Sequence, residues 1–200
     1  NDVTVGHQII GTVVTLRTSG TSADVIINGD INNTSGDITI NAADNVEINN
    51  SFQANGSADS DVDITANGNV VISSDTVIRV NNDLNSSITF NSNIDDDGIG
   101  AASSLQLNAL AGDVNLSTVG ANTALSSLDV NAGGTATLNG NITTQGAAPR
   151  GVIFDGSPDV DLGGSITINT SAGGGTINLN GGAVDGNQDL TLNAGGGAII

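Results

Sequence analysis

Two groups of aspartates are the residues of this sequence whose type and spacing best suit chemistry. The first group is the consecutive run of Asp95, Asp96 and Asp97. The second group, with a carboxylate at every other position, consists of Asp59, Asp61 and Asp63. Carboxylate oxygens in a glycine-containing loop are ligands that calcium prefers. Calcium is therefore the candidate metal, although the sequence indicates no cofactor that the protein requires.

Neither group follows an established calcium loop. The spaced aspartates and distal glutamate of an EF-hand are missing, and so is the glycine-rich nonapeptide of calcium-binding β-rolls. A strand over residues 59–63 would place its three carboxylates on one outward face, where a cation can bind between them. A similar group, interrupted by Pro158, consists of Asp155, Asp159 and Asp161. The alternative for every group is a solvated charged surface that maintains solubility.

The same carboxylates raise the question of an enzyme, because two carboxylates at the right separation hydrolyse a glycosidic bond. The sequence offers little to bind a sugar: Trp and Tyr are absent, and the three arginines are dispersed at positions 17, 79 and 150. His7, the single histidine, lacks the Ser and Asp spacing of a catalytic triad. We therefore expect that the protein is not an enzyme.

Short strands must position these carboxylates. Apolar residues occur throughout the chain as pairs two positions apart, such as Ile38 with Ile40 and Val62 with Ile64. A period of two places each pair on one face of a strand. No stretch shows a sustained period of 3.6 residues, so the sequence predicts an all-β protein.

A longer pattern organises these pairs. From Ile38 onward, two alternating apolar residues and an Ala are followed by three turn-like residues and a second apolar pair. Copies of this pattern begin at Val62, Leu128, Val152 and Leu190. A coil of about 24 residues cannot bury its apolar side alone, so neighbouring coils must stack. The repeat therefore predicts a parallel β-helix, or β-solenoid, with an irregular region at about 78–128.

The repeat also has a longer period. The copies that begin at Val14 and Ile38 recur at Ile166 and Leu190, which predicts a super-repeat of 152 residues. We interpret residues 1–200 as a single β-solenoid segment excised from a longer repeat protein, with neighbouring repeats of that chain as partners. Asn follows the second apolar residue of several copies, which predicts a ladder of stacked amides at Asn41, Asn91, Asn108, Asn131, Asn169 and Asn193.

Charge and hydropathy exclude two classes of partner. The formal net charge is −18, from 20 Asp and one Glu against three Arg. Such a chain repels nucleic acid, which needs cations to neutralise its phosphates, so we expect no nucleic-acid partner. No run of 18 apolar residues is present, so we expect no direct membrane insertion. Cys is absent, and the redox compartment is therefore left open.

The amino-acid sequences of several copies resemble those of a known class of protein. The stretches are LSSLDVNAGGTATLNGNITTQGA (125–147), GVIFDGSPDVDLGGSITINT (151–170) and GGGTINLNGGAVDGNQDLTLNAGGGAI (173–199). They resemble giant β-strand-repeat surface proteins of bacteria, of the filamentous haemagglutinin-like adhesin class, most clearly over residues 103–200. The resemblance implies a right-handed parallel β-helix, secretion to the bacterial cell surface or outer membrane, and a role in cell adhesion. It implies no catalytic residues.

Three functions follow from these observations. The first is a structural or adhesive repeat segment of a very large extracellular protein, which mediates or spaces contact between cells or surfaces. The second is a calcium-dependent module that binds a glycan or a surface protein of another cell, marked by a concave acidic face or an ordered loop at 95–104 or 143–151. The third is a carbohydrate-active β-helix enzyme, which requires carboxylates that converge in a groove.

Overall fold

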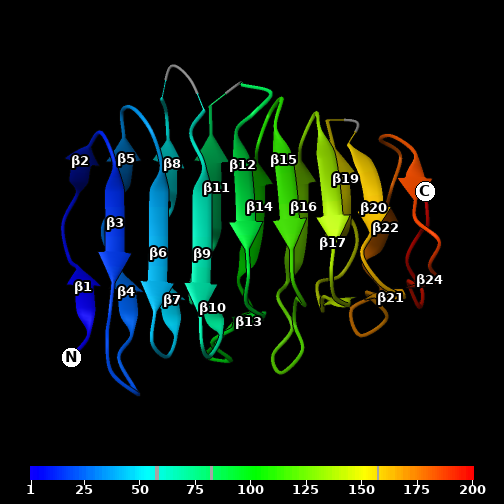
Figure 1. The fold of residues 1–200 in the computed structure, drawn as a ribbon. Helices are drawn as coiled ribbons and strands as arrows, with labels where there is room; N and C mark the ends of the chain where they lie inside the picture. The colour runs from blue at the N-terminus through cyan, green and yellow to red at the C-terminus, as the bar shows by residue number, and fades with distance from the viewer. Residues whose placement is uncertain (57–58, 82, 157) are drawn as a thin grey trace.

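The chain winds into a rod of stacked coils, with the two termini at opposite ends (Figure 1). The computed structural model describes residues 1–56, 59–81, 83–156 and 158–200. Within these ranges there are about eight turns of roughly 24 residues, and there is no helix. Every strand pairs in parallel with the strand one coil before or after it. The all-β parallel solenoid predicted from the sequence is confirmed.

The strands of successive coils form three faces that run along the rod. Face A consists of β1 (Val3–Val5), β4 (Val25–Ile27), β7 (Val46–Ile48), β10 (Val70–Ile72), β13 (Ile94–Asp96), β18 (Ile142–Thr143), β21 (Ile166–Asn169) and β24 (Leu190–Asn193). Between β13 and β18, Val119 continues face A through single bridges to Ile94 and Ile142.

The other two faces are continuous sheets. Face B consists of β2 (Ile9–Gly11), β5 (Ile31–Asn33), β8 (Phe52–Ala54), β11 (Thr76–Val80), β14 (Ser104–Asn108), β16 (Ser127–Asn131), β19 (Gly151–Asp155) and β22 (Thr176–Asn178). Face C consists of β3 (Val14–Arg17), β6 (Ile38–Ala42), β9 (Val62–Ala66), β12 (Ser87–Phe90), β15 (Asp113–Leu116), β17 (Thr135–Leu138), β20 (Asp159–Leu162) and β23 (Val184–Asp185).

The apolar pairs of the sequence point inward and stack along the rod. On face C, for example, Ile38 pairs in register with Val62, and Ile40 pairs with Ile64. All four side chains are fully buried. Full burial of one such side chain contributes about 1.5–3 kcal/mol, and each coil needs its neighbours to achieve it. The stacking of like on like thus supplies the core of the rod.

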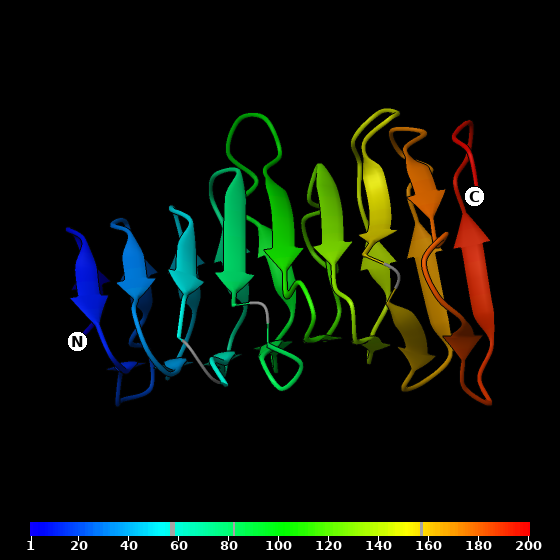
Figure 2. The same cartoon turned by 90° about the horizontal axis from the view of Figure 1, so that it is seen from above.

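The coil is right-handed. In Figure 1 the strands of face C run down the front, and the chain returns upward behind them as it advances from left to right. Figure 2 shows from above the same succession of coils from the N-terminus to the C-terminus. Crossovers between parallel strands are right-handed in nearly all proteins, because a right-twisted strand packs back on its sheet most readily in that sense.

Equivalent copies one super-repeat of 152 residues apart lie on different faces. The copy at Ile38 begins on face C, whereas the copy at Leu190 begins on face A. The super-repeat of 152 residues is about eight residues longer than six coils of about 24 residues. About eight residues are the length of one strand with its corner, so the second copy is shifted to the next face. A strand–corner–strand unit is therefore used at more than one corner of the coil.

Coil length varies most between residues 62 and 136. Val62 pairs with Ile88, which makes this coil longer than the typical coil of roughly 24 residues. Val114 pairs with Ala136, which closes a shorter coil. On face B, the step from β11 to β14 is longer than either. The additional residues lie in the corners, so the inward positions of the strands stay in register.

Candidate functional site

The consecutive aspartates lie on face A and not in an open loop. Asp95 and Asp96 belong to β13 and are 3% and 4% exposed. Asp96 pairs in register with Ile72, so this carboxylate occupies a core position that apolar side chains fill in earlier coils. Asp97 follows the strand and is half-buried. A solvated charged loop, the alternative interpretation of this run, does not describe Asp95 and Asp96.

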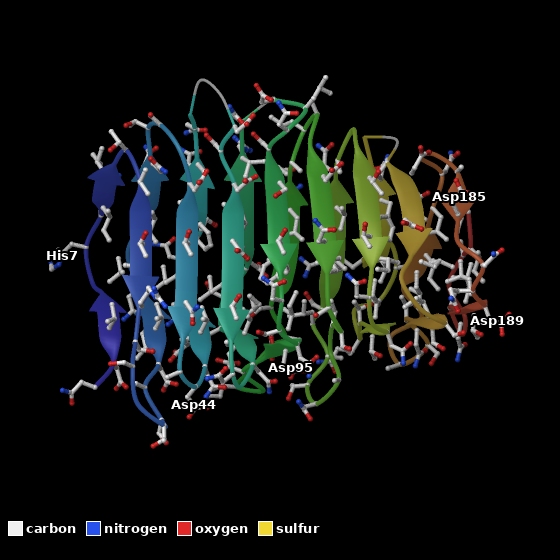
Figure 3. All side chains as sticks on the ribbon, in the orientation of Figure 1. His7, Asp44, Asp95, Asp185 and Asp189 are labelled. Atoms are coloured by element: carbon white, nitrogen blue, oxygen red, sulfur yellow. The ribbon has the colours of Figure 1, made fainter. Side chains whose placement is uncertain are left out.

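Asp95 accepts hydrogen bonds from the corner of the following coil, at Asn122 and Thr123. Its Oδ1 accepts the backbone N–H groups of Asn122 and Thr123 at 2.9 and 3.2 Å, and its Oδ2 accepts the Asn122 amide at 2.8 Å. Three donated bonds satisfy most of the capacity of a carboxylate. In Figure 3, Asp95 lies along the lower edge of the rod, on the same side as Asp44.

Asp96 and Asp97 hold the loop that follows β13. Asp96 accepts the N–H of Gly98 at 2.8 Å and that of Ser103 at 2.7 Å, one on each carboxylate oxygen. Asp97 Oδ1 accepts the Ile99 N–H at 2.8 Å. The loop at 97–103 is therefore ordered by carboxylates, because charge-assisted bonds to backbone N–H are among the stronger ones.

An acidic groove lies beside these residues on the outer side of face A. It has a volume of about 430 Å³, and its acidic lining comes from Asp24, Glu47, Asp95, Asp96 and Asp97. Within the described ranges, no three His, Cys, Asp or Glu side chains are arranged to hold a metal ion. Calcium binding at Asp95, Asp96 and Asp97 stays a prediction, and this groove is where the ion would lie.

The alternating aspartates lie on or beside β9 of face C. Asp61 and Asp63 point outward and line an open cleft of about 320 Å³, in which Asp37 of the preceding coil joins them. Asp59 is exposed at the corner before the strand and does not line this cleft. The structure thus brings together two of the three predicted residues and adds one that the pattern did not indicate.

The cleft carboxylates differ in their environment. Burial raises the pKa of Asp63, and the neighbouring Asp61 carboxylate raises it further, although a bond from the Asn91 amide opposes both. Asp61 Oδ1 accepts both the N–H and the hydroxyl of Ser87, at 2.7 and 2.9 Å. An acid beside an ionised carboxylate is one requirement of glycoside hydrolysis. The remaining lining is Thr39, Ser87, Thr89 and Asn91, which gives a sugar ring no aromatic platform.

The third acidic group continues along face C. Asp159 and Asp161 lie on β20 and are exposed, and Asp161 pairs in register with Asp185 of β23. Asp185 is near the C-terminal end of the rod in Figure 3. Asp155 ends β19 on face B, so it does not share this outward row.

A directional side-chain ladder connects the coils, and it was not predicted from the sequence. An Asp or Asn directly before the first inward residue of a strand accepts the N–H of the matching residue one coil later. The acceptor–donor pairs on face C are Asp37–Asp61, Asp61–Ser87, Asp113–Thr135 and Asp159–Ala183. The pairs on face A are Asp2–Asp24, Asp24–Asn45, Asn45–Asn69 and Asn141–Thr167. The signal in the sequence is Asp or Asn one position before the apolar pair, repeated at the coil period.

The amide ladder predicted from the sequence does not form as a continuous column. Asn169 and Asn193 are in register, but Asn169 Oδ1 accepts the Ser171 N–H and Asn193 Oδ1 accepts the Gly195 N–H within their own coils. Amides do bond between coils elsewhere: the Asn49 amide donates to Asn28 Oδ1 at 2.8 Å. Asn side chains therefore have two uses: some form local turns, as a short side chain favours, and others bond to the preceding coil.

Two other carboxylates, both on face B, have shifted pKa values. The backbone N–H and then the hydroxyl of Ser104 lower the pKa of Asp75. Burial raises the pKa of Asp129, with a further contribution from the Asp155 carboxylate. Asp129 Oδ1 is buried without a hydrogen-bond partner among the described residues, so ionised Asp129 costs stability at neutral pH.

The loops at 95–104 and 143–151 approach each other where face A turns into face B. They border a groove of about 570 Å³, lined by small residues from Gly100 to Ala102 and by residues 145–150, including Arg150. The two loops predicted as markers of a binding module thus face each other across this groove. His7 is exposed near the N-terminal end of the rod, apart from both loops (Figure 3).

Comparison with known proteins finds no matching family model, no matching curated protein and no matching solved structure. Among the described residues, no helix has the length and apolar character needed to cross a bilayer.

Proposed function

We propose that the chain is a structural repeat segment of a very large bacterial surface protein, where it spaces and displays surface that mediates contact between cells. The observation that carries the proposal is the uninterrupted stacking of about eight coils. At about 4.8 Å per coil, this length of chain extends roughly 38 Å. Stacked coils convert sequence length into reach, which is the property that a spacer needs.

The polar exterior and the repeat sequences also support a role as a structural spacer at the cell surface. Net charge of −18 discourages lateral association of rods and edge-to-edge pairing of their strands. The resemblance of the repeats to filamentous haemagglutinin-like adhesins supports the surface location and the adhesive role.

The test is labelling of intact cells. Antibodies raised against the purified chain are applied to two samples of the organism that encodes it: intact cells and lysed cells. Labelling of intact cells, removed by external protease, is the expected result. A signal that arises only after lysis would contradict the surface location. Loss of cell–cell contact on deletion of the coils, with recovery when an unrelated rod of equal length replaces them, would identify spacing as the role.

The acidic groove on face A favours a second function, a calcium-dependent binding module. Isothermal titration with calcium measures it directly, with Glu47→Gln as the variant because Glu47 lines the groove and accepts a side-chain amide, that of Asn49 at 3.0 Å, and no backbone N–H among the described residues. Saturable binding that weakens in this variant supports the module. Heat no greater than that of dilution contradicts it.

A further inference from the structure

A groove on face B lies apart from the acidic clusters, and its lining is mostly uncharged. It has a volume of about 360 Å³, within the usual range for small-molecule sites. It crosses the first four coils, from the residues beside β2 to those of β11. The outward side chains that line it include Asp30, Asn32, Ser51, Gln53, Val77 and Arg79.

The strand register arranges these side chains in two rows. Asn32, Gln53 and Arg79 form one row, because Asn32 pairs with Gln53 and Gln53 pairs with Arg79. Each coil therefore presents one planar polar group about every 4.8 Å along the rod. Val77 belongs to the second row. It lies two positions before Arg79 on β11, so its aliphatic side chain is beside the guanidinium-bearing one on the same face of the strand.

Arg79 is a cation that has no partner among the described residues of a strongly acidic protein. Its side chain is exposed, and its neighbours in register are Gln53 and Asn108, which carry no charge. Within the described ranges the Arg79 guanidinium has no hydrogen bond and no ion pair. Asp75, the carboxylate directly before β11, is occupied by the N–H and hydroxyl of Ser104 at 2.8 Å. The guanidinium is thus free to bind a carboxylate through two parallel N–H donors.

We propose that this groove binds an extended oligosaccharide that carries one carboxylated sugar. The carboxylate lies on Arg79, and hydroxyls of the following sugars bond to Gln53, Asn32 and Asp30 along the rod. The apolar side of the acidic sugar packs on Val77. Amide and carboxylate groups offer paired donors and acceptors that match adjacent hydroxyls. The spacing of the coils is close to the rise of one hexose unit in an extended chain.

Other ligand classes fit this groove less well. A peptide that adds to a sheet needs a free strand edge, whereas β5, β8 and β11, the strands that line this groove, are already paired on both sides. A polyanion is repelled by the net charge of −18. A single carboxylate is tolerated, because charges more than about 8 Å away are largely screened at physiological salt. The inference does not depend on the surface location proposed above, since it rests on the groove alone.

The experiment compares two probes by isothermal titration: a β-1,4-linked glucose tetrasaccharide, and the same tetrasaccharide with glucuronic acid as its non-reducing unit. The proteins are the 200-residue chain, Arg79→Gln and Arg17→Gln, the last being an exposed arginine on face C. We expect about tenfold tighter binding of the acidic probe by the unmodified chain. Arg79→Gln removes this preference and Arg17→Gln keeps it. EDTA leaves it unchanged, which separates this groove from a calcium-dependent site.

Three results would overturn the proposal: no binding of either probe at millimolar concentration, equal affinity for both probes, or an unchanged preference in Arg79→Gln. Circular dichroism and thermal unfolding establish that each variant is folded. A second variant, Gln53→Ala, weakens binding of both probes to a similar extent and leaves the preference for the acidic probe, because the amide contacts a neutral sugar. If Gln53→Ala leaves both affinities unchanged, the proposed path of the sugar chain is wrong.

Discussion

At the scale of the residue, most of the acidic side chains with resolved contacts act as acceptors for backbone N–H groups. Asp95 and Asp96 each receive N–H bonds from corner residues, and Asp113 receives one from Thr135 of the next coil. Unpaired backbone donors at the corners of a solenoid would be costly, and short carboxylate side chains satisfy them without an additional strand. The acidity of the protein thus has a structural use besides solubility.

Asp113 tests the inter-coil ladder. Replacing Asp113 with Ala removes the acceptor of the Thr135 N–H, which lies 2.7 Å from Oδ1. We expect the free energy of unfolding to fall by about 1 kcal/mol, measured by urea denaturation. Asp113→Asn keeps Oδ1 and most of the stability. Asp185→Ala is the control at an exposed position with no side-chain bond among the described residues. Equal losses in Asp113→Ala and Asp185→Ala would show that the ladder contributes nothing.

Asp129 tests the cost of a buried carboxylate. Because the pKa of Asp129 is raised in the folded state, its proton is bound more tightly there than in the unfolded chain. The contribution of this group to stability is therefore greatest below the unfolded pKa of about 3.9, and it is lost as pH rises through the folded pKa. Asp129→Asn should be more stable than the unmodified chain at pH 7, by about 0.5 kcal/mol after solvent screening.

The measurement is urea denaturation of both proteins from pH 3 to pH 7. The advantage of Asp129→Asn should vanish toward pH 3, where the unmodified side chain is also neutral. A variant that is less stable than the unmodified chain at pH 7 would mean that the bond to the Gln106 amide outweighs the burial of charge.

At the scale of the element, the corners limit the fold more strictly than the strands do. Gly120 has a φ of 68°, which favours glycine, and it lies at the turn after the Val119 bridge. A Cβ built on Gly120 would lie 2.2 Å from the carbonyl oxygen of Thr143 in the next coil. Coils stack backbone on backbone at this corner, so the lack of a side chain is what allows the approach.

Gly120→Ala tests this corner. Positive φ and the contact with Thr143 should together reduce the free energy of unfolding by about 3 kcal/mol. Gly164→Ala is the matched control, because a Cβ there would have no neighbour within 4 Å, and we expect a change within about 0.5 kcal/mol. Thermal and urea unfolding measure both variants. A small effect in both would mean that the coils can separate at this corner without cost.

At the scale of the whole molecule, the rod is a one-dimensional stack in which each coil touches its neighbours. Its stability is then approximately a sum over coils and their interfaces. Whole coils should be removable, provided that one strand is lost from each face and that the corners still connect the correct faces. We therefore expect the rod to tolerate deletion of a whole coil, which a compact globular domain would not.

Deletion of residues 38–61 tests this additivity. It removes β6, β7 and β8, which is one strand from each face, and it joins the corner before β6 to β9 of the same face. We expect a folded rod with cooperative unfolding and a free energy of unfolding lower by about 1–4 kcal/mol. Deletion of residues 38–49 removes strands from only two faces and should prevent cooperative folding. Circular dichroism and urea unfolding decide, and similar behaviour of the two deletions would contradict the coil as the unit.

The sequence by itself determined the strands and their stacking. Pairs such as Ile38 with Ile40 and Val62 with Ile64 must turn inward, and the regular coil period brings the two pairs into register. Both conclusions follow from local chemistry, because apolar alternation and glycine-rich corners act within a few residues. The sequence also indicated Asp95 to Asp97 as a group of interest.

Only the tertiary structure decided what these side chains do. Asp96 lies in an inward column and Asp95 is covered by the next coil. The residues adjacent to them in the sequence do not predict the burial of these two carboxylates. The groove with Arg79 likewise joins residues from four coils. The lengths of the corners set which strands of successive coils become neighbours, and these lengths vary between residues 62 and 136. Contacts between coils depend on that sum of lengths, so no local pattern specifies them.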